Sequence, residues 1–542
     1  MAGPAPASAS LPLPPERAGG SRLPWVLTTV LVVLTVLALF VGNGNLGLAL
    51  APCLLVAAVW GACVLPLRHS LLTLLALAWL LDAPNDAFAA GKVALPWRQV
   101  GAVLWGKLNL LVPVPALVIT GFDLVALFLF GLLLYRHLHR LRIDRTGWAD
   151  VPAPLTLCMW LCLAAVIWMS AYGMARGGSF RFVLWQSVRW LYLPVVFFLM
   201  RHGLRGPSDA RALGKVLLVV GVIRAAEAIV IRLLFPSVED LPHATTHHDS
   251  VLFALCTGIL VALLIEVPTR KTFAFTAVLF PVFAWAMDAN NRRLVWAEVA
   301  LVLLVFWVMT PWRPLKRKLA RLMVHAAVPL FLYLAVGWNA RGAIFSPVHK
   351  LRSMTDSSAN SSTLWRDLEN FNLVFTYRDS PLLGSGFGHP FVERIRLPDV
   401  TAAYELEPYV PHNSVLGLWA FGGLLGFFLL WMVFPVGMYF TARAYRWSRT
   451  PLERVTLLGA AAAQVCYTVQ GYGDLGFGTW GPLFTVAAAL ALAGKMAVSS
   501  GAWVPAPAFH SLWSGTHGAF ESSAPPGPES SGNGMTRGST LR

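Results

Sequence analysis

Arginine and histidine side chains stand beside long apolar runs at several places in this sequence. Arg292 and Arg293 are adjacent, Arg366 follows a tryptophan, and His412 stands directly before Asn413. The planar fork of arginine N–H donors binds several phosphate oxygens at once. A histidine, whose ordinary pKa is near neutrality, is suited to take a proton from an attacking hydroxyl group. These residue types would serve the transfer of a group from a diphosphate to a hydroxyl.

Two further stretches are candidates for contacts with the same anion. Arg176 and Arg181 lie in the segment ARGGSFR, and Gly384 and Gly386 lie in DSPLLGSGFGH. The glycines do not form a phosphate loop, because the lysine and the strand-to-helix context are missing. We expect them to make tight turns that let the backbone approach a substrate. The structural alternative stays open, since an arginine at the end of a span is more often a lipid-headgroup anchor.

The composition decides which class of protein must position these residues. Hydrophobic residues make up 57% of the 542 residues, charged residues make up 13%, and the mean hydropathy is +0.63. A water-soluble domain would need more polar surface, so the chain is expected to be an all-α polytopic membrane protein. The formal charge of +16 is scattered in short clusters between apolar runs, which argues against nucleic acid as a partner. All six cysteines lie inside apolar runs, where we expect neither a disulfide nor a metal site.

The apolar runs predict a bundle of about 12–14 transmembrane helices with one long outer loop. We expect a disordered cytoplasmic N-terminus over 1–23, transmembrane helices 1–11 over 24–338, a large periplasmic loop over 339–412, C-terminal transmembrane helices over 413–498, and a disordered cytoplasmic tail over 499–542. The run at 24–41 is expected to be an uncleaved first helix. Further runs include 46–66, 71–90, which is the weakest, and 414–440.

Short loops rich in Lys and Arg predict the orientation, because such loops stay in the cytoplasm. The basic loops fall around 136–145, 201–211, 270–271, 313–321 and 443–454, which all lie on one side when the spans are counted. The loop 339–412 falls on the other side, with seven Lys or Arg against eight Asp or Glu. We expect both termini in the cytoplasm, and an active site that faces the periplasm of a bacterial inner membrane.

Three segments resemble the O-antigen ligase and O-antigen polymerase superfamily of bacterial surface-glycan assembly. They are NNRRLVWAEVALVL at 290–303, Trp365-Arg366 followed by DSPLLGSGFGH at 379–389, and HNSVLGLWAFGGLLG at 412–426. The resemblance covers about 290–440 and departs from the family where Arg292-Arg293 replaces a Ser-Arg pair, so which arginine matches is open.

The resemblance implies a metal-independent glycosyltransferase without a cofactor. Its donor would be an undecaprenyl-diphosphate-linked glycan, and its acceptor another glycan, a lipid A core or a protein hydroxyl. In that reading His412 is the base, Arg366 and Arg293 grip the diphosphate, and Arg292, Arg176, Arg181, Gly384, Gly386 and Asn413 contact substrate. Membrane lipids would surround the chain. If His412 is not the base, Glu405 or Glu407 is the next candidate.

Other interpretations remain. His243, His247, His248 and Asp249 could bind zinc, although the suspected chemistry requires no metal. Arg224 and Glu227 are expected to form a buried pair one helical turn apart. A polysaccharide transporter or flippase would also have many spans, but the sequence shows neither the internal repeats nor the broken helices typical of transporters. A non-catalytic subunit of a surface-polysaccharide export complex would keep the fold without His412 or the arginines.

Overall fold

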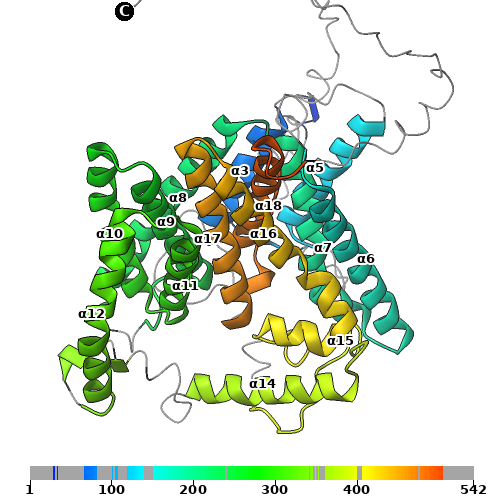
Figure 1. Ribbon diagram of the computed structural model, residues 1–542. Helices are drawn as coiled ribbons and strands as arrows, with labels where there is room; N and C mark the ends of the chain where they lie inside the picture. The colour runs from blue at the N-terminus through cyan, green and yellow to red at the C-terminus, as the bar shows by residue number, and fades with distance from the viewer. Residues whose placement is uncertain are drawn as a thin grey trace, which may run out of the picture. The chain divides into compact units, whose positions relative to one another are not determined.

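The computed structural model describes residues 29–30, 33, 66–81, 101, 104–107, 119–138, 150–237, 241–340, 342–345, 348–349, 352, 361–398, 406–473 and 476–504. The helices in chain order are α3 (Leu67–Leu80), α5 (Gly121–Leu138), α6 (Ala153–Ala175), α7 (Phe180–Gly203), α8 (Pro207–Leu234), α9 (His247–Glu266), α10 (Arg270–Asn290), α11 (Leu294–Met309), α12 (Pro314–Gly337), η2 (Ala343–Phe345), α14 (Ser361–Asp379), α15 (Ser414–Trp431), α16 (Val433–Trp447), α17 (Pro451–Gly473), η4 (Gly476–Gly478) and α18 (Trp480–Ser499) (Figure 1). Apart from one isolated bridge between Lys107 and Thr120, the described residues contain no β-structure. The predicted all-α class is confirmed for this part of the chain.

Seven helical segments of the described residues are long and apolar enough to cross a membrane. They are α6, α7, α9, α10, Lys316–Gly337 of α12, the combined segment Ser414–Trp447, and α18. Helices α3, α11 and the first part of α5 are apolar but shorter. The chain is therefore a multi-pass membrane protein. The count of about 12–14 spans stays a prediction, and the spans expected at 24–41 and 46–66 lie almost wholly outside the described residues.

Burial separates a central helix from a peripheral one. Helix α18 is buried from Trp480 to Ala497 and packs against α3, α7, α16 and α17. Its alanines and glycines allow the neighbouring backbones to approach closely. Helix α12 lies at the edge of the bundle (Figure 1), and none of the residues in its most apolar stretch is buried. That exposure suits a helix whose apolar side chains face lipid.

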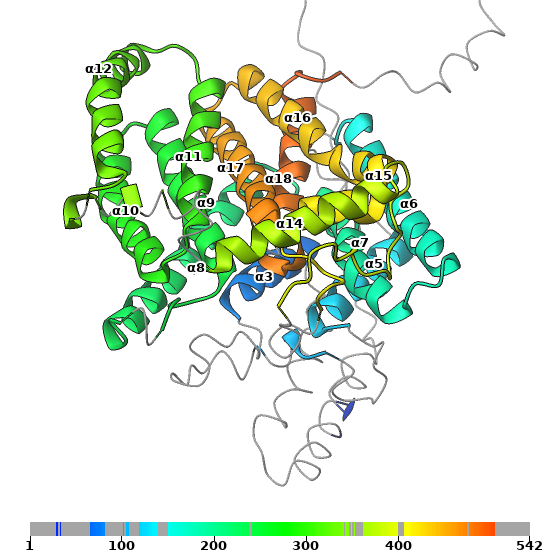
Figure 2. The same cartoon turned by 90° about the horizontal axis from the view of Figure 1, so that it is seen from below.

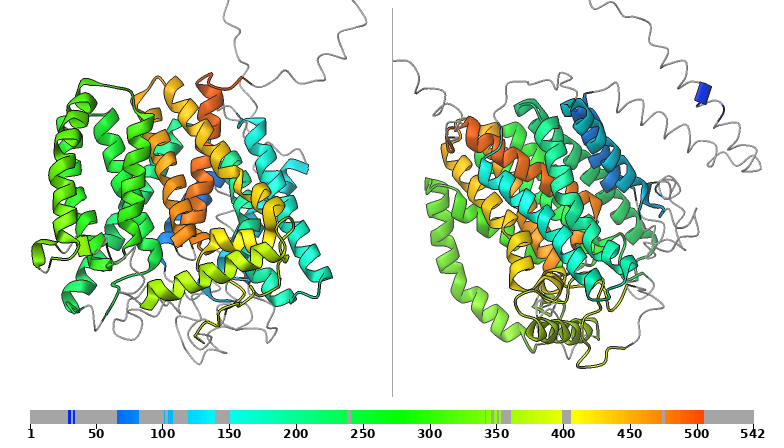
Figure 3. Two further views of the ribbon diagram at one scale, coloured as in Figure 1. Left: turned by 60° about the horizontal axis from the view of Figure 1, so that its bottom comes forward. Right: turned by 90° about the vertical axis from the view of Figure 1, so that its right-hand side faces the viewer.

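Helix α14 lies inside the segment that the sequence predicts as a long loop. Most of its residues are polar or charged. It runs across the ends of other helices instead of alongside them (Figures 1 and 2, and Figure 3, left). It packs against α15. The sequence carried a signal for this helix, because Leu364, Leu368, Phe371 and Phe375 recur at helical spacing.

Helix α15 is broken at Gly423, which has φ 58° and ψ −162°. The sequence did not predict this break, and the predicted span 414–440 consists of two helices, α15 and α16, that extend to Trp447. The segment 380–388 fills the break. Ser385 and Gly386 donate their N–H groups to the carbonyl oxygens of Ala420 and Phe421, at 3.2 and 2.9 Å, and the N–H groups of Leu424 and Leu425 bind the carbonyl oxygens of Pro381 and Leu382, at 2.8 and 3.1 Å. These bonds satisfy the backbone groups that the break releases.

Helix α9 connects two chemically different ends of the bundle. His247 begins it, and Glu266 ends it 20 residues later, which corresponds to about 30 Å. The carboxylate of Glu266 binds Arg313 at 3.2 Å and Arg454 at 3.7 Å, so two of the basic loops meet there. His247 instead lines a cavity with Arg292 and Arg293. The basic loops and these arginines thus lie at opposite ends, in agreement with the predicted alternation, while the compartment that each end faces stays a prediction.

Candidate active site

Three of the predicted arginines line one cavity of about 120 Å³. Arg292 and Arg293 enter it from the turn between α10 and α11, and Arg366 enters it from α14. The remaining lining residues are His243, His247, Ser250, Asn291, Leu294 and Gln470. None of the described lining residues is Asp or Glu. The structure therefore brings together a cluster of cationic side chains from elements that are distant in the sequence. We call it the arginine cavity.

Asn290 holds the arginine turn in place. This residue is fully buried at the end of α10, and its side chain donates to the carbonyl oxygen of Thr246 at 3.0 Å and to the hydroxyl of Ser250 at 2.8 Å. Its side-chain oxygen also accepts the N–H of Thr245 at 2.9 Å. Asn291 follows in the left-handed region at φ 50°, which ends the helix. Sequence reasoning singled out the arginines of NNRR and missed the asparagine that anchors them.

The electrostatics of the arginine cavity are those of an anion site. Burial, and then the positive charge of Arg366, lower the pKa of the Arg293 guanidinium. Arg293 also donates to the hydroxyl of Thr363, one turn before Arg366, at 3.4 Å. Burial, and then the charge of Arg292, lower the pKa of His243 to about 4, so this ring is neutral at pH 7. An anion entering the cavity would relieve the repulsion between these cations.

His412 forms a buried pair with an acid that sequence reasoning missed, Glu369 of α14. The backbone N–H of His412 donates to Glu369 Oε1 at 3.0 Å, and His412 Nδ1 lies 3.3 Å from the same oxygen. The Glu369 side chain is 1% exposed and that of His412 is 24% exposed. Trp365 packs edge-on against the imidazole, with 4.7 Å between the ring centroids. When Nδ1 carries the proton and donates to Glu369, the lone pair that can accept a proton is on Nε2.

Asn413 fixes His412 at the mouth of α15. Its side-chain oxygen accepts the N–H of Leu416 at 3.0 Å, which caps the helix, and its side-chain nitrogen donates to Asn370 of α14 at 3.0 Å. Asn370 stands one turn after Arg366 on the same face of α14. Asn413 therefore links the histidine to the helix that carries the arginine, and its predicted contact with substrate stays a prediction.

The other predicted contact residues are Arg176, Arg181, Gly384 and Gly386, which lie outside the arginine cavity. Arg176 caps α6 and donates to the carbonyl oxygen of Gly384 at 3.4 Å and to the hydroxyl of Tyr172 at 3.3 Å. Arg181 lies over the ring of Phe182, 5.4 Å from its centroid. Neither arginine lines the arginine cavity. The N–H groups of Gly384 and Gly386 are donated to backbone carbonyl oxygens, so these amides could bind a substrate only by giving up those bonds.

A second, aromatic cavity of about 80 Å³ is lined in part by residues next to His412 and Asn413 in the chain. It is lined by Trp185, Gln186, Arg189, Trp190, Phe387, Tyr409, Val410, Pro411, Ser414, Gly417, Leu418, Phe421, Phe477 and Gly478. Pro411 and Ser414 flank the His412-Asn413 pair in the chain. Gln186 organises one wall, donating to the carbonyl oxygens of His389 at 3.0 Å and Tyr409 at 2.6 Å. Aromatic faces of this kind suit the C–H faces of apolar or sugar-like ligands, whereas the side chains of the arginine cavity suit an anion.

The histidine cluster and the intramembrane charges have other partners. Arg224 binds Glu227 at 2.6 Å and both oxygens of Asp249, at 2.8 and 2.6 Å, so the predicted Arg224–Glu227 pair is present and a third member was missed. Asp249 also accepts from Thr246 in a capping box. The carboxylate is thus turned toward Arg224, and among the described residues no group of three or more His, Cys, Asp or Glu side chains could hold a metal ion.

The fold and site define an all-helical, multi-pass membrane protein with an arginine cavity and a buried His–Glu pair at one end. No model of a known protein family matches the sequence, and no curated protein sequence matches it either.

Proposed function

We propose that this chain is a metal-independent membrane glycosyltransferase of the O-antigen ligase or polymerase type. It would transfer or polymerise an undecaprenyl-diphosphate-linked oligosaccharide on the periplasmic side of a bacterial inner membrane. The observation that carries the proposal is the arrangement on α14, where Arg366 lines the arginine cavity and the adjacent turn, through Trp365 and Glu369, holds His412. Helix α14 therefore contacts both a cation cluster and a positioned base, which suits a reaction in which a hydroxyl nucleophile displaces an anionic leaving group.

In the proposed reaction the donor diphosphate occupies the arginine cavity. The acceptor hydroxyl gives its proton to Nε2 of His412 while its oxygen attacks the anomeric carbon of the donor sugar. The bond from that carbon to the diphosphate oxygen breaks, and the lipid diphosphate leaves with the electron pair, held by Arg293 and Arg366. Glu369 stabilises the imidazolium that forms. A single displacement of this kind inverts the anomeric configuration. The aromatic cavity, which Pro411 and Ser414 help to line, suits the acceptor sugar.

A transporter or flippase is the second candidate, because the break in α15 at Gly423 is a feature of many transporters. The break here is filled by four backbone hydrogen bonds from segment 380–388. A break that is closed in this way supports a fixed scaffold around His412 more than a moving gate.

The experiment compares His412→Gln with His325→Gln in a deletion strain, with glycan transfer read on gels and protein levels by blot. His325 is an exposed histidine on α12, outside the site. Glutamine keeps a polar side chain of similar reach but cannot act as a base near neutrality. We expect transfer to disappear in the His412 variant, by about two to four orders of magnitude in rate, and to persist in the His325 variant.

A well-expressed His412→Gln protein with normal transfer would exclude the histidine as base. Loss of surface glycan in cells, combined with no glycan transfer by the purified wild-type chain, would support the transporter instead.

A further inference from the structure

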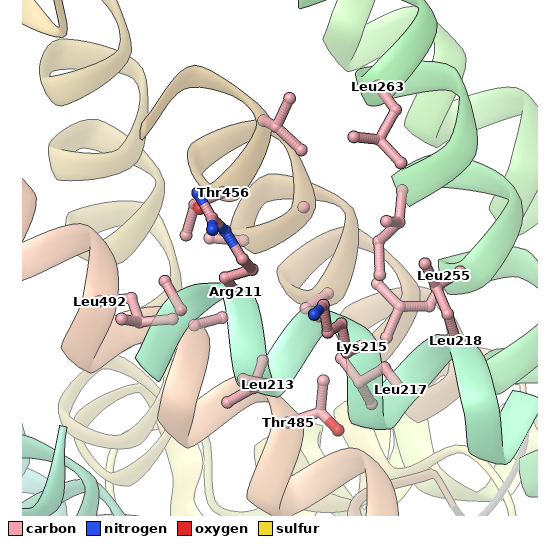
Figure 4. A pocket seen from close by; sticks show the side chains of 18 of the residues that line it. Arg211, Leu213, Lys215, Leu217, Leu218, Leu255, Leu263, Thr456, Thr485 and Leu492 are labelled. Atoms are coloured by element: carbon pink, nitrogen blue, oxygen red, sulfur yellow. The ribbon is translucent and has the colours of Figure 1, made fainter. Parts of the chain in front are cut away.

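A large apolar cavity lies away from the arginine cavity, between α8, α9, α17 and α18 (Figure 4). Its volume is about 350 Å³, within the range of about 300–1,000 Å³ typical of small-molecule sites. Small residues leave the space open. A Cβ atom added at Gly214 would meet nothing within 4 Å, and one added at Gly459 would meet only Ile259, at 3.7 Å. The remaining wall is mainly leucine, including Leu213, Leu217, Leu255, Leu263 and Leu492.

Two cations are the only charged residues among the described residues that line this cavity. Arg211 and Lys215 stand one turn apart on α8, both are exposed, and Figure 4 shows both head groups in the space between α8 and α17. An apolar cavity with a cationic edge does not suit a soluble polar ligand. It suits an amphiphile with an apolar chain and an anionic head.

The cavity belongs to the basic end of the bundle. It is lined by the first half of α8, the second half of α9 and the beginning of α17, and Glu266 at the end of α9 binds Arg313 and Arg454. At such a boundary, long cationic side chains extend toward lipid headgroups while their stems cover apolar surface. Anionic headgroups are attracted to clusters of this kind.

We propose that this cavity binds one anionic phospholipid, with an acyl chain between α8, α9, α17 and α18 and the phosphate on Arg211 and Lys215. The site is independent of the proposed transferase reaction, which lies at the other end of α9. Its occupant packs against α9 and α17, which also line the arginine cavity through His247, Ser250 and Gln470, and α8 is joined to α9 by the Arg224–Asp249 pair. Bound lipid therefore stabilises the packing of α8 and α9.

The test uses the purified full-length chain in detergent, with phosphatidylglycerol and phosphatidylcholine of identical acyl chains as probes. Binding is measured by native mass spectrometry, and stabilisation by thermal unfolding. We expect phosphatidylglycerol to bind about thirtyfold more tightly than phosphatidylcholine, because each of the two cations strengthens the binding of an anionic headgroup about fivefold and the two factors multiply. The double variant Arg211→Gln, Lys215→Gln should lose most of this preference. Lys271→Gln, an exposed lysine that does not line the cavity, should keep it.

A second variant tests the position of the acyl chain. Gly459→Leu directs a side chain into the cavity from a position where its Cβ would have only Ile259 within 4 Å, so it should fold and lose both lipids. Equal affinity of the wild-type chain for the two lipids would overturn the role of the cations. Unchanged lipid binding by Gly459→Leu, or equal competition by soluble glycerol phosphate, would overturn the cavity as the site. A loss in Lys271→Gln as large as in the double variant would assign the effect to general surface charge.

Discussion

Replacing Glu369 with Gln tests the buried pair that the proposed mechanism requires. The substitution keeps a side-chain oxygen that can accept the N–H of His412, so the link between α14 and the start of α15 survives. It removes the negative charge 3.3 Å from Nδ1. Because a buried charge is itself costly to desolvate, we expect the variant to be about as stable as the wild-type protein.

The size of the expected rate loss in Glu369→Gln follows from the short distance between Glu369 and His412. Two unit charges about 4 Å apart interact by about 4 kcal/mol at an effective dielectric constant of about 20. With the proton about half transferred in the transition state, about 2 kcal/mol of this interaction is lost, which corresponds to about thirtyfold in rate. Because His412 is partly exposed, solvent screening makes the rate loss smaller, whereas misorientation of the imidazole makes it larger. We therefore expect kcat to fall by about 10- to 100-fold.

The assay measures transfer by purified protein in lipid nanodiscs at varied donor concentration. Glu369→Gln should lower kcat and leave the KM for donor unchanged, because the arginine cavity is intact. Glu393→Gln, an exposed acid of the same segment, is the matched control and should behave as wild type. A normal kcat in Glu369→Gln, or a change confined to the KM for donor, would contradict the role of the pair.

Four further predictions follow from individual contacts. Arg366→Lys should raise the KM for donor about tenfold or more, measured by steady-state kinetics, because lysine keeps the charge but loses the bidentate fork. The pKa of His243 is lowered to about 4, against about 6.5 in the unfolded chain. The stability of the protein should therefore be full above about pH 6.5 and fall toward pH 4. Thermal unfolding of His243→Gln should depend less on pH than that of the wild-type protein. Asn290→Ala should destabilise the protein by about 2–4 kcal/mol in chemical unfolding, because three buried hydrogen bonds are lost. Gly423→Ala places a Cβ 2.5 Å from the Gly384 nitrogen and should abolish folding on size-exclusion chromatography, whereas Gly131→Ala, with nothing within 4 Å, should not.

Hydropathy was sufficient to predict the class of fold, because long apolar segments carry their signal locally. Hydropathy did not predict the break in α15, because two adjacent glycines within an apolar run, here Gly422 and Gly423, also suit an unbroken helix that packs closely against a neighbour. The break depends on carbonyl and amide groups supplied by segment 380–388, about 40 residues earlier. Helix α14 was missed for another reason: a polar helix gives no hydropathy peak, although its apolar residues recur at helical spacing.

The acid that contacts His412 could not be predicted from the sequence. Glu405 and Glu407 were named only as alternative bases, and no acidic partner of His412 was predicted; in the structure that partner is Glu369, 43 residues earlier. Nothing in the local sequence distinguishes Glu369 from the other acids of 339–412. Its position is decided by the docking of α14 on α15, where Asn370 and Asn413 fix the register between the two helices. The same docking directs Arg366, one turn before Asn370, into the arginine cavity. In the proposed mechanism α14 both carries Arg366 and holds His412 through Glu369, so a shift of α14 would change the donor contact and the orientation of the imidazole together.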